Sequence, residues 1–566
     1  MTMLRPSLIV AALVALPLMV SGAAPPAGLA PHATSTRVAG IDVDATTIPQ
    51  LQELMDDHRL SSVQLVQFYL HRIKKLNPEL HAVITVSPTA LADARAADRA
   101  RRQGVVQPLL GIPVIVKDNI NTTGMPTTAG SWALAGSSPS DAFIVQRLRA
   151  AGAIIIGKAN LSEWANFRSN PSSSGWSGIG GQTNMAYVLD RNPCGSSSGS
   201  GVIASANLAT ITVGTETDGS IVCPSGANGI VGIKPTLGLL SRAGIIPISA
   251  DQDTAGPMTR NVTDAAVMLG VMTGVDSADP ATAEQVGHAV ADYTQFLDAD
   301  ALRGARIGVW REGTYDPEVS PEVDAIINAT VAALEAAGAT IVDPARIPVE
   351  PAFGPEFAAL LCEFKDDIAG YLGTHTAASY PKTLQDLIDF NNLNPDLEGP
   401  WNSLIFDLAQ ETGGRASPDC VAARQLATST AQAAIDDTLA LYNLDAIIAP
   451  TNGPAWVTDP VNGDLGGDFS TFVGSSSPSA IAGYPNITVP AGYVGPLPVG
   501  VSFIGRRWDE PTLIALAYAF EQATQIRVPP TFLESISATS ARGPASRKMQ
   551  RAVPGRDWTN RLMPLR

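Results

Sequence analysis

A serine-rich segment over residues 194–200 carries the clearest candidates for a nucleophile in this chain. Gly195–Gly199 satisfies the pattern G-x-S-x-G with Ser197 at its centre, which in α/β-hydrolases presents a nucleophilic serine on a sharp turn. Such a serine needs a histidine base, and only His288 and His375 follow it in the chain. Neither histidine stands at the end of a predicted strand beside an acidic loop motif, so a histidine-dependent esterase is the weaker interpretation.

Two lysines at predicted strand ends could serve as the base in place of histidine. Lys117 ends the apolar run Leu110–Val116, and Lys158 ends a similar run. Burial disfavours the ammonium form of lysine and lowers its pKa, and a neutral amine can take the proton of a serine hydroxyl. Asp118 and Asn119 follow Lys117 and are polar enough to orient it. The local sequence does not choose between the two lysines.

The elements that must position these groups alternate between short apolar strands and helices. Strands are predicted at residues 110–116, 153–156, 211–213, 307–309, 340–342 and 446–449. Helical periodicity covers residues 48–75, 142–151, 264–273, 323–337 and 510–523. The strand–helix–strand order over 306–343 indicates parallel neighbours, and strands without polar alternation indicate a sheet covered on both faces. We therefore predict an α/β fold: a single large domain with a central mixed, mostly parallel twisted sheet and helices on both faces.

Composition excludes several classes of protein. The 566 residues are 45% hydrophobic and 16% charged, which argues against a disordered chain. The net charge of −16 argues against a nucleic-acid or anionic-membrane partner. Six histidines and four cysteines, without zinc-binding spacing, predict no metal and no cofactor.

The two ends of the chain differ from its body. The run Ser7–Val20 is apolar and uncharged, shorter than a membrane span, and followed by small residues, as in a secretory signal peptide cleaved after Ala23, Ala24 or Ala30. We therefore expect a secreted, periplasmic or extracellular protein. The predicted division is a signal peptide over 1–24, a leader over 25–44, a catalytic domain over 45–530 with a variable cap near 285–420, and a basic, disordered tail over 531–566.

Three segments resemble the motifs of the amidase signature family. Gly111–Asn119 resembles its lysine motif, Cys194–Ser200 its Gly/Ser loop, and Gly214–Ile221 its nucleophile segment. Ser196 and Ser220 also have the separation that the family shows between its two serines. Further segments of the family follow in order at Val231–Thr236, Asp253–Met258, Ala482–Gly500 and Glu510, so the resemblance covers residues 45–530.

This resemblance implies a role for each matching residue. Lys117 would be the base, Ser196 a bridging serine after a cis peptide bond from Gly195, and Ser220 the nucleophile. The remaining implied roles are an oxyanion hole formed by backbone N–H groups of Thr217, Asp218, Gly219 and Ser220, and a supporting hydrogen bond from Ser197. The implied reaction is hydrolysis of a carboxamide C–N bond with release of ammonia through an acyl-enzyme.

Departures from the family pattern bear on the substrate. Val222 and Cys223 replace a frequent Ile-Arg pair, which removes a cation for a substrate carboxylate and disfavours an aminoacyl-tRNA amidotransferase. Asp218 replaces glycine and either accepts a hydrogen bond from a substrate N–H or braces its loop. The other replacements are Cys194 and Ser198 for glycine, and Glu216 for aspartate.

The strings CGSSSGS and GTETDGSIVCP, with residues 158–164, resemble the bacterial peptide amidase branch of the family. We therefore expect hydrolysis of the C-terminal amide of peptides, with a small-molecule or short-peptide amide as substrate. The alternatives are a broad-specificity aliphatic or aryl amidase and, from another class, a non-catalytic amide-binding homologue. The four cysteines, Cys194, Cys223, Cys362 and Cys420, allow three pairings, and free thiols are equally open.

Overall fold

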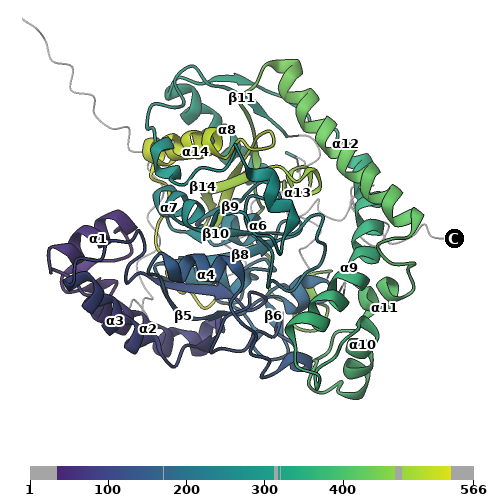
Figure 1. Ribbon diagram of the computed structural model, residues 1–566. Helices are drawn as coiled ribbons and strands as arrows, with labels where there is room; N and C mark the ends of the chain where they lie inside the picture. Colours follow the sequence, from purple (N-terminus) through teal and green to yellow (C-terminus); the bar gives the residue numbers. More distant parts are fainter. Residues whose placement is uncertain (1–34, 170, 312–316, 319, 466–473, 537–566) are drawn as a thin grey trace, which may run out of the picture.

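An eleven-stranded mixed sheet forms the centre of the molecule (Figure 1). The computed structural model describes residues 35–536 except 170, 312–316, 319 and 466–473, so the predicted signal peptide and most of the predicted tail lie outside the described residues. The order of the sheet is β12-β11-β13-β15-β14-β9-β10-β8-β4-β5-β3. These strands are β3 (Val83–Val86), β4 (Pro113–Lys117), β5 (Ile154–Ala159), β8 (Ile211–Glu216), β9 (Val231–Lys234), β10 (Thr254–Thr259), β11 (Arg306–Val309), β12 (Thr340–Val342), β13 (Ala446–Pro450), β14 (Asn486–Val494) and β15 (Leu497–Ile504).

All six predicted strands lie in this sheet, and the predicted helices are present. The α-helices are α1 (Ile48–Asp56), α2 (Ser62–Leu80), α3 (Ala90–Arg102), α4 (Phe143–Ala150), α5 (Ser198–Ser205), α6 (Val222–Ala227), α7 (Val262–Met272), α8 (Pro321–Ala336), α9 (Phe353–His375), α10 (Leu384–Leu393), α11 (Leu404–Gln410), α12 (Pro418–Tyr442), α13 (Ser477–Ala482) and α14 (Glu510–Thr524). The helix predicted over 48–75 is broken between α1 and α2, where Ser61 caps the second helix.

The sheet is mixed as predicted, but parallel pairing does not dominate it. Strand β4 is parallel to β5 and β8, and β11 is parallel to β12 and β13. The other neighbouring pairs are antiparallel, because β10 inserts between β8 and β9 against both and β14 turns directly back into β15. The expectation of a mostly parallel sheet is thus wrong: one strand–helix–strand unit does not fix the direction of strands joined by hairpins.

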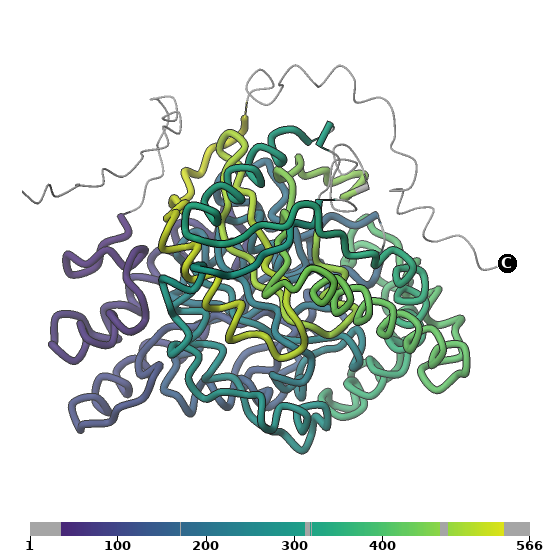
Figure 2. The backbone as a smooth tube through the Cα atoms, turned by 90° about the horizontal axis from the view of Figure 1, so that it is seen from above, coloured from purple at the N-terminus to yellow at the C-terminus, as the bar shows by residue number. Residues whose placement is uncertain are grey.

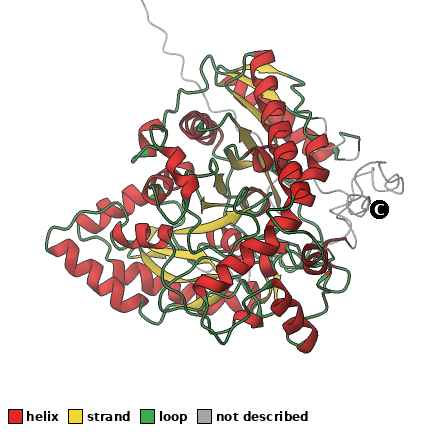
Figure 3. Cartoon of the chain, turned by 45° about the vertical axis from the view of Figure 1, so that its right-hand side comes forward, coloured by secondary structure: helices red, strands yellow, loops and turns green. Residues whose placement is uncertain are grey.

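Helices cover both faces of the sheet (Figure 3). On β9, a Cβ at Gly232 would collide with Ser225 of α6, so this residue faces α6. Its neighbours Val231 and Ile233 belong to the main hydrophobic core, together with residues of α7 and α14. Since alternate residues of a strand point to opposite faces, α6 lies on one face and α7 and α14 on the other.

The cap helices and the N-terminal helices lie at opposite ends of the molecule (Figure 2). Helices α9, α10 and α11 form a second apolar core with Trp164 and Phe167, and a disulfide between Cys362 and Cys420 joins α9 to α12. The predicted cap over 285–420 is too wide, because β11, α8 and β12 within it are part of the central sheet layer.

The N-terminal part of the described chain is folded from before residue 45. Strands β1 (Arg37–Val38) and β2 (Ile41–Asp42) form a hairpin within the segment predicted as a leader. Asp44 is buried and forms ion pairs with Arg260 and Arg527. Among the described residues, no helix combines the length and apolar character needed to cross a membrane.

Candidate active site

Lys117 lies at the end of β4 with its amine fully buried. Its Nζ is 2.7 Å from Ser196 Oγ, 3.0 Å from Thr215 Oγ1 and 3.3 Å from the carbonyl oxygen of Thr215. Burial lowers the pKa of Lys117 to about 7, although Asp253 and Glu216 oppose the shift. A large fraction of Lys117 is therefore a neutral amine near neutral pH.

Lys158 resembles Lys117 in sequence but faces a different environment. Its Nζ is 3.2 Å from Asp118 Oδ1 and donates to the carbonyl of Ile120 and to Thr127 Oγ1, both at 2.8 Å. These contacts engage Lys158 in an ion pair below the loop that follows β4. The structure thus brings Lys117 to the serines, and it gives Asp118 to Lys158 instead of to Lys117.

The loop that carries Ser196 is packed too tightly to admit side chains at its glycines. A Cβ at Gly199 would collide with the backbone of Ala82 and Asn160, so glycine is required where α5 begins against β5. The Gly195–Ser196 peptide bond is cis, as the resemblance implies. A disulfide between Cys194 and Cys223 ties this loop to α6, which follows Ser220.

Ser220 ends a turn that connects β8 to α6. Glu216 Oε2 accepts hydrogen bonds from the N–H groups of Ile221 and Val222, at 2.7 and 3.0 Å, and so fixes where the helix begins. Gly219 has φ of +81°, a conformation that favours glycine. The carbonyl of Ser220 accepts from Ser197 N at 3.2 Å, which places Ser220 beside the Ser196 loop.

The residues predicted as an oxyanion hole form this turn. No acceptor within the described ranges receives the N–H of Gly219 or Ser220. The side chain of Asp218 accepts a hydrogen bond from Ser476 Oγ, so it braces the turn against the loop before α13. Of the two roles considered for Asp218, the observed contact fits the structural one.

Ser197 has its hydroxyl engaged with the backbone of β8. Its Oγ donates to the carbonyl of Thr215 at 3.0 Å and accepts from Thr215 N at 3.2 Å, which matches the supporting role that the resemblance implies. The two histidines lie elsewhere: His288 stacks on Trp508, and His375 lies against Tyr371 on α9. Within the described residues, no three His, Cys, Asp or Glu side chains are grouped as a metal site requires.

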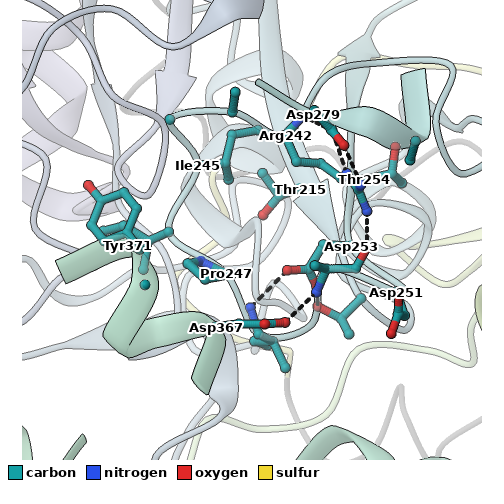
Figure 4. A pocket seen from close by; sticks show the side chains of 18 of the residues that line it. Thr215, Arg242, Ile245, Pro247, Asp251, Asp253, Thr254, Asp279, Asp367 and Tyr371 are labelled. Atoms are coloured by element: carbon teal, nitrogen blue, oxygen red, sulfur yellow. Dashed lines mark hydrogen bonds and ion pairs between the residues drawn. The ribbon is translucent and has the colours of Figure 1, made fainter. Parts of the chain in front are cut away.

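A cavity of about 650 Å³ adjoins the buried lysine and serines (Figure 4). Asn119, Thr215 and Thr217 line it on the side of Lys117. Its other walls are the loops over 242–254 and 278–284 and the end of α9. The volume is in the range of small-ligand pockets.

Sequence reasoning missed Thr215 and the walls of this cavity. Thr215 lies within the nucleophile segment, so its position was visible, but its contact with Lys117 depends on the pairing of β4 with β8. Asp251, Asp367 and Arg415 come from distant segments that only the folded chain brings together. No local pattern marks them.

Comparison with known proteins places the chain in one family. The family model described as Amidase matches residues 64–514. A probable amidase of Arabidopsis thaliana is 40% identical, over 87% of this chain and 92% of the relative. The amidase-type subunit of a glutamyl-tRNA(Gln) amidotransferase from Symbiobacterium thermophilum is 34% identical, over 84% and 96%.

Solved structures agree with this placement. The native peptide amidase of Stenotrophomonas maltophilia is 48% identical, with a TM-score of 0.81 over 86% of this chain and 98% of that one. A structure of the peptide amidase PAM with the competitive inhibitor chymostatin gives 48% and 0.82, over 86% and 99%. The chain therefore belongs to the amidase signature family and is an amide hydrolase.

Proposed function

We propose that this chain hydrolyses the C-terminal carboxamide of peptides, with Ser220 as nucleophile, Ser196 as proton bridge and Lys117 as base. The observation that carries the proposal is the 2.7 Å contact between the fully buried amine of Lys117 and Ser196 Oγ. A positioned base at this distance can take a proton from a hydroxyl group.

The hydrogen-bond partners of Lys117 fit a neutral amine. A neutral amine has two N–H donors and one lone pair. The carbonyl of Thr215 can only accept, and Thr215 Oγ1 already receives Asn119 Nδ2 at 2.9 Å. If both N–H groups point to Thr215, the lone pair is left for the hydroxyl hydrogen of Ser196. This arrangement is the one in which Lys117 acts as a base.

The reaction then proceeds in two balanced halves. Ser220 Oγ attacks the carboxamide carbon while its proton passes through Ser196 to Lys117. When the tetrahedral intermediate collapses, the C–N bond breaks, Ser196 returns a proton to the nitrogen, and ammonia leaves. Water attacks the acyl-enzyme by the same proton route and releases the peptide acid and free Ser220.

The turn over 217–220 would stabilise the negative oxygen of the intermediate. Its N–H groups are held by the Glu216 cap on one side and by the Asp218–Ser476 hydrogen bond on the other. Fixed donors of this kind typically contribute about 10²–10³-fold in rate per donor. Asn or Ser side chains elsewhere in the site are not needed for this step.

Two observations support a peptide amide as substrate. The cavity of about 650 Å³ is larger than a simple aliphatic amide requires. The peptide amidase structures share 48% identity with this chain, against 34% for the amidotransferase relative. The absence of an arginine at 222–223 also leaves that position without a cation for a short acidic amide.

A substrate panel tests the proposal. Ammonia release is measured for a tripeptide amide, the same peptide as free acid, propionamide, an aryl acylamide with assay of the released amine, and glutamine. We expect the highest kcat/KM for the peptide amide and no cleavage of internal peptide bonds. Equal or higher kcat/KM for the simple or aryl amides would indicate the broad amidase instead. No turnover of any amide would leave only the amide-binding homologue.

We further propose that the protein is exported after cleavage of residues 1–24. The support is the order of residue types in this segment and the presence of two disulfides, Cys194–Cys223 and Cys362–Cys420, which persist in oxidising compartments. N-terminal sequencing of protein recovered outside the cytoplasm should begin after Ala23, Ala24 or Ala30. Recovery only from the cytoplasm with an intact Met1 would contradict export.

A further inference from the structure

The cavity beside Thr215 carries more carboxylates than cations. Its walls include seven carboxyl side chains and three guanidinium groups. The carboxyl groups are those of Glu216, Asp251, Asp253, Asp279, Glu284, Asp366 and Asp367, and the cations are Arg242, Arg415 and Arg507. The remaining titratable group of the lining with a basic nitrogen, His375, has its pKa lowered by burial and adds no charge at neutral pH.

One group of three carboxylates shares a single arginine. Arg415 Nη2 lies 2.5 Å from Asp251 and its Nη1 lies 2.9 Å from Asp367, while its backbone N–H donates to Asp366 at 2.7 Å. Two arginines are already committed elsewhere, Arg242 to Asp279 and Arg507 to Glu284. The cluster around Arg415 therefore keeps excess negative charge at the α9 side of the cavity.

Asp253 adds a further carboxylate close to the catalytic turn. It accepts from Thr217 Oγ1 at 2.6 Å and from the N–H groups of Ile248 and Ser249 at 2.8 and 3.0 Å. In the part of the chain that the structure describes, no cation forms an ion pair with it. Figure 4 shows Asp251, Asp253 and Asp367 gathered on one side of Thr215.

An independent feature of the cavity also calls for a donor. Asn119 lines the cavity and is 3% exposed, and its Nδ2 is used by Thr215 Oγ1. Its Oδ1 receives no hydrogen bond from any described residue. A buried carbonyl oxygen without a donor costs free energy, so a bound group that presents an N–H here is favoured. The amide nitrogens of a peptide carboxamide are groups of this kind.

We propose that this cavity selects substrates that carry a cationic ammonium or guanidinium group away from the scissile carboxamide. The inference rests on the proposed function, because the carboxamide must reach Ser220 while the cation faces the carboxylates around Arg415. Asn119 binds an N–H of the substrate near the reacting end, and Asp251 and Asp367 attract the cation at the other end. The cation comes either from the amino terminus of a short peptide or from a lysine or arginine side chain.

Matched peptides separate these two sources. One pair is a tripeptide amide with a free amino terminus and its N-acetylated form. A second pair is N-acetylated and carries either lysine or norleucine before the last residue, and a glutamate peptide completes the set. Within at least one pair, we expect kcat/KM to be about three- to tenfold higher for the cationic member at low salt. The pair that shows the advantage identifies the source of the cation.

Variants tie the preference to the cavity. In Asp251→Asn and in the double variant with Asp367→Asn, the ratio of cationic to neutral kcat/KM should fall toward one. Asp300→Asn is the matched control, since Asp300 also pairs with one arginine, Arg303, but lies exposed outside the cavity. If the double variant does not fold, loss of the wild-type ratio at high NaCl gives the same reading.

The outcomes separate the two proposals. Equal kcat/KM across both pairs, or a preference for the glutamate peptide, would overturn the selection of cations and leave peptide amide hydrolysis intact. A ratio that persists in Asp251→Asn and in the double variant would also overturn it. Absence of ammonia from every peptide amide would contradict the proposed function and this inference together.

Discussion

Lys117 and Lys158 show how two residues with the same local sequence acquire different roles. Both end a buried strand and both are fully buried. One faces a serine hydroxyl and carries no ion pair among the described residues, whereas the other pairs with Asp118. The difference depends on what the neighbouring loops place opposite each amine.

Substitution of each lysine by methionine should therefore fail in a different way. Lys117→Met removes the base and should lower kcat by about 10²–10⁴-fold while the protein stays folded. Lys158→Met leaves the buried Asp118 carboxylate without its cation and should lower the free energy of unfolding by about 3–5 kcal/mol. Ammonia release and urea denaturation measure the two effects. The reverse pattern would show that the roles are exchanged.

The pH dependence of activity should follow the amine of Lys117. Because the base must be neutral, kcat/KM should rise with pH up to a midpoint near the pKa of about 7. At pH 5 it should be about a hundredfold below its plateau. A rate unchanged between about pH 5 and pH 9 would contradict the neutral-lysine mechanism.

Asp253 provides the control for this pH profile, because burial raises its own pKa to about 6. Its carboxylate favours the charged form of Lys117, so Asp253→Asn should lower the pKa of Lys117 and move the midpoint to lower pH. The acid limb itself should remain. Disappearance of the limb in Asp253→Asn would assign it to the carboxyl group instead of the amine.

At the scale of elements, the site depends on two loops that approach each other from β8 and from the start of α5. Ser197 bonds both to the backbone of Thr215 and to that of Ser220. The Cys194–Cys223 disulfide adds a covalent link between the same two segments. Small errors in the position of reacting groups cost rate steeply, so we expect this link to matter for catalysis.

The two disulfides form a matched pair for testing that expectation. Cys194→Ala with Cys223→Ala, and Cys362→Ala with Cys420→Ala, each open a loop and should each lower the free energy of unfolding by about 3–4 kcal/mol. Only the first pair should also lower kcat, by about tenfold or more, when activity is assayed well below the unfolding transition. Equal kcat in both double variants would show that hydrogen bonds alone position the serines.

At the scale of the whole molecule, the sequence predicted the reactive residues better than the sheet. Lys117, Ser196 and Ser220 lie in short motifs whose order along the chain is itself informative. Strands β14 and β15 were missed because Pro490 and Pro498 interrupt their apolar pattern, and proline is unusual in strands at the centre of a sheet. The cavity was missed because its walls come from segments more than a hundred residues apart.

The direct test of the whole reaction is the covalent intermediate. During turnover of a peptide amide, protein quenched in acid and measured by intact mass spectrometry should gain the mass of the peptide less ammonia. Digestion should locate the adduct on Ser220, and Ser220→Ala should show neither adduct nor ammonia release. An adduct on Ser197, or ammonia release that persists in Ser220→Ala, would contradict the assignment of Ser220 as the nucleophile.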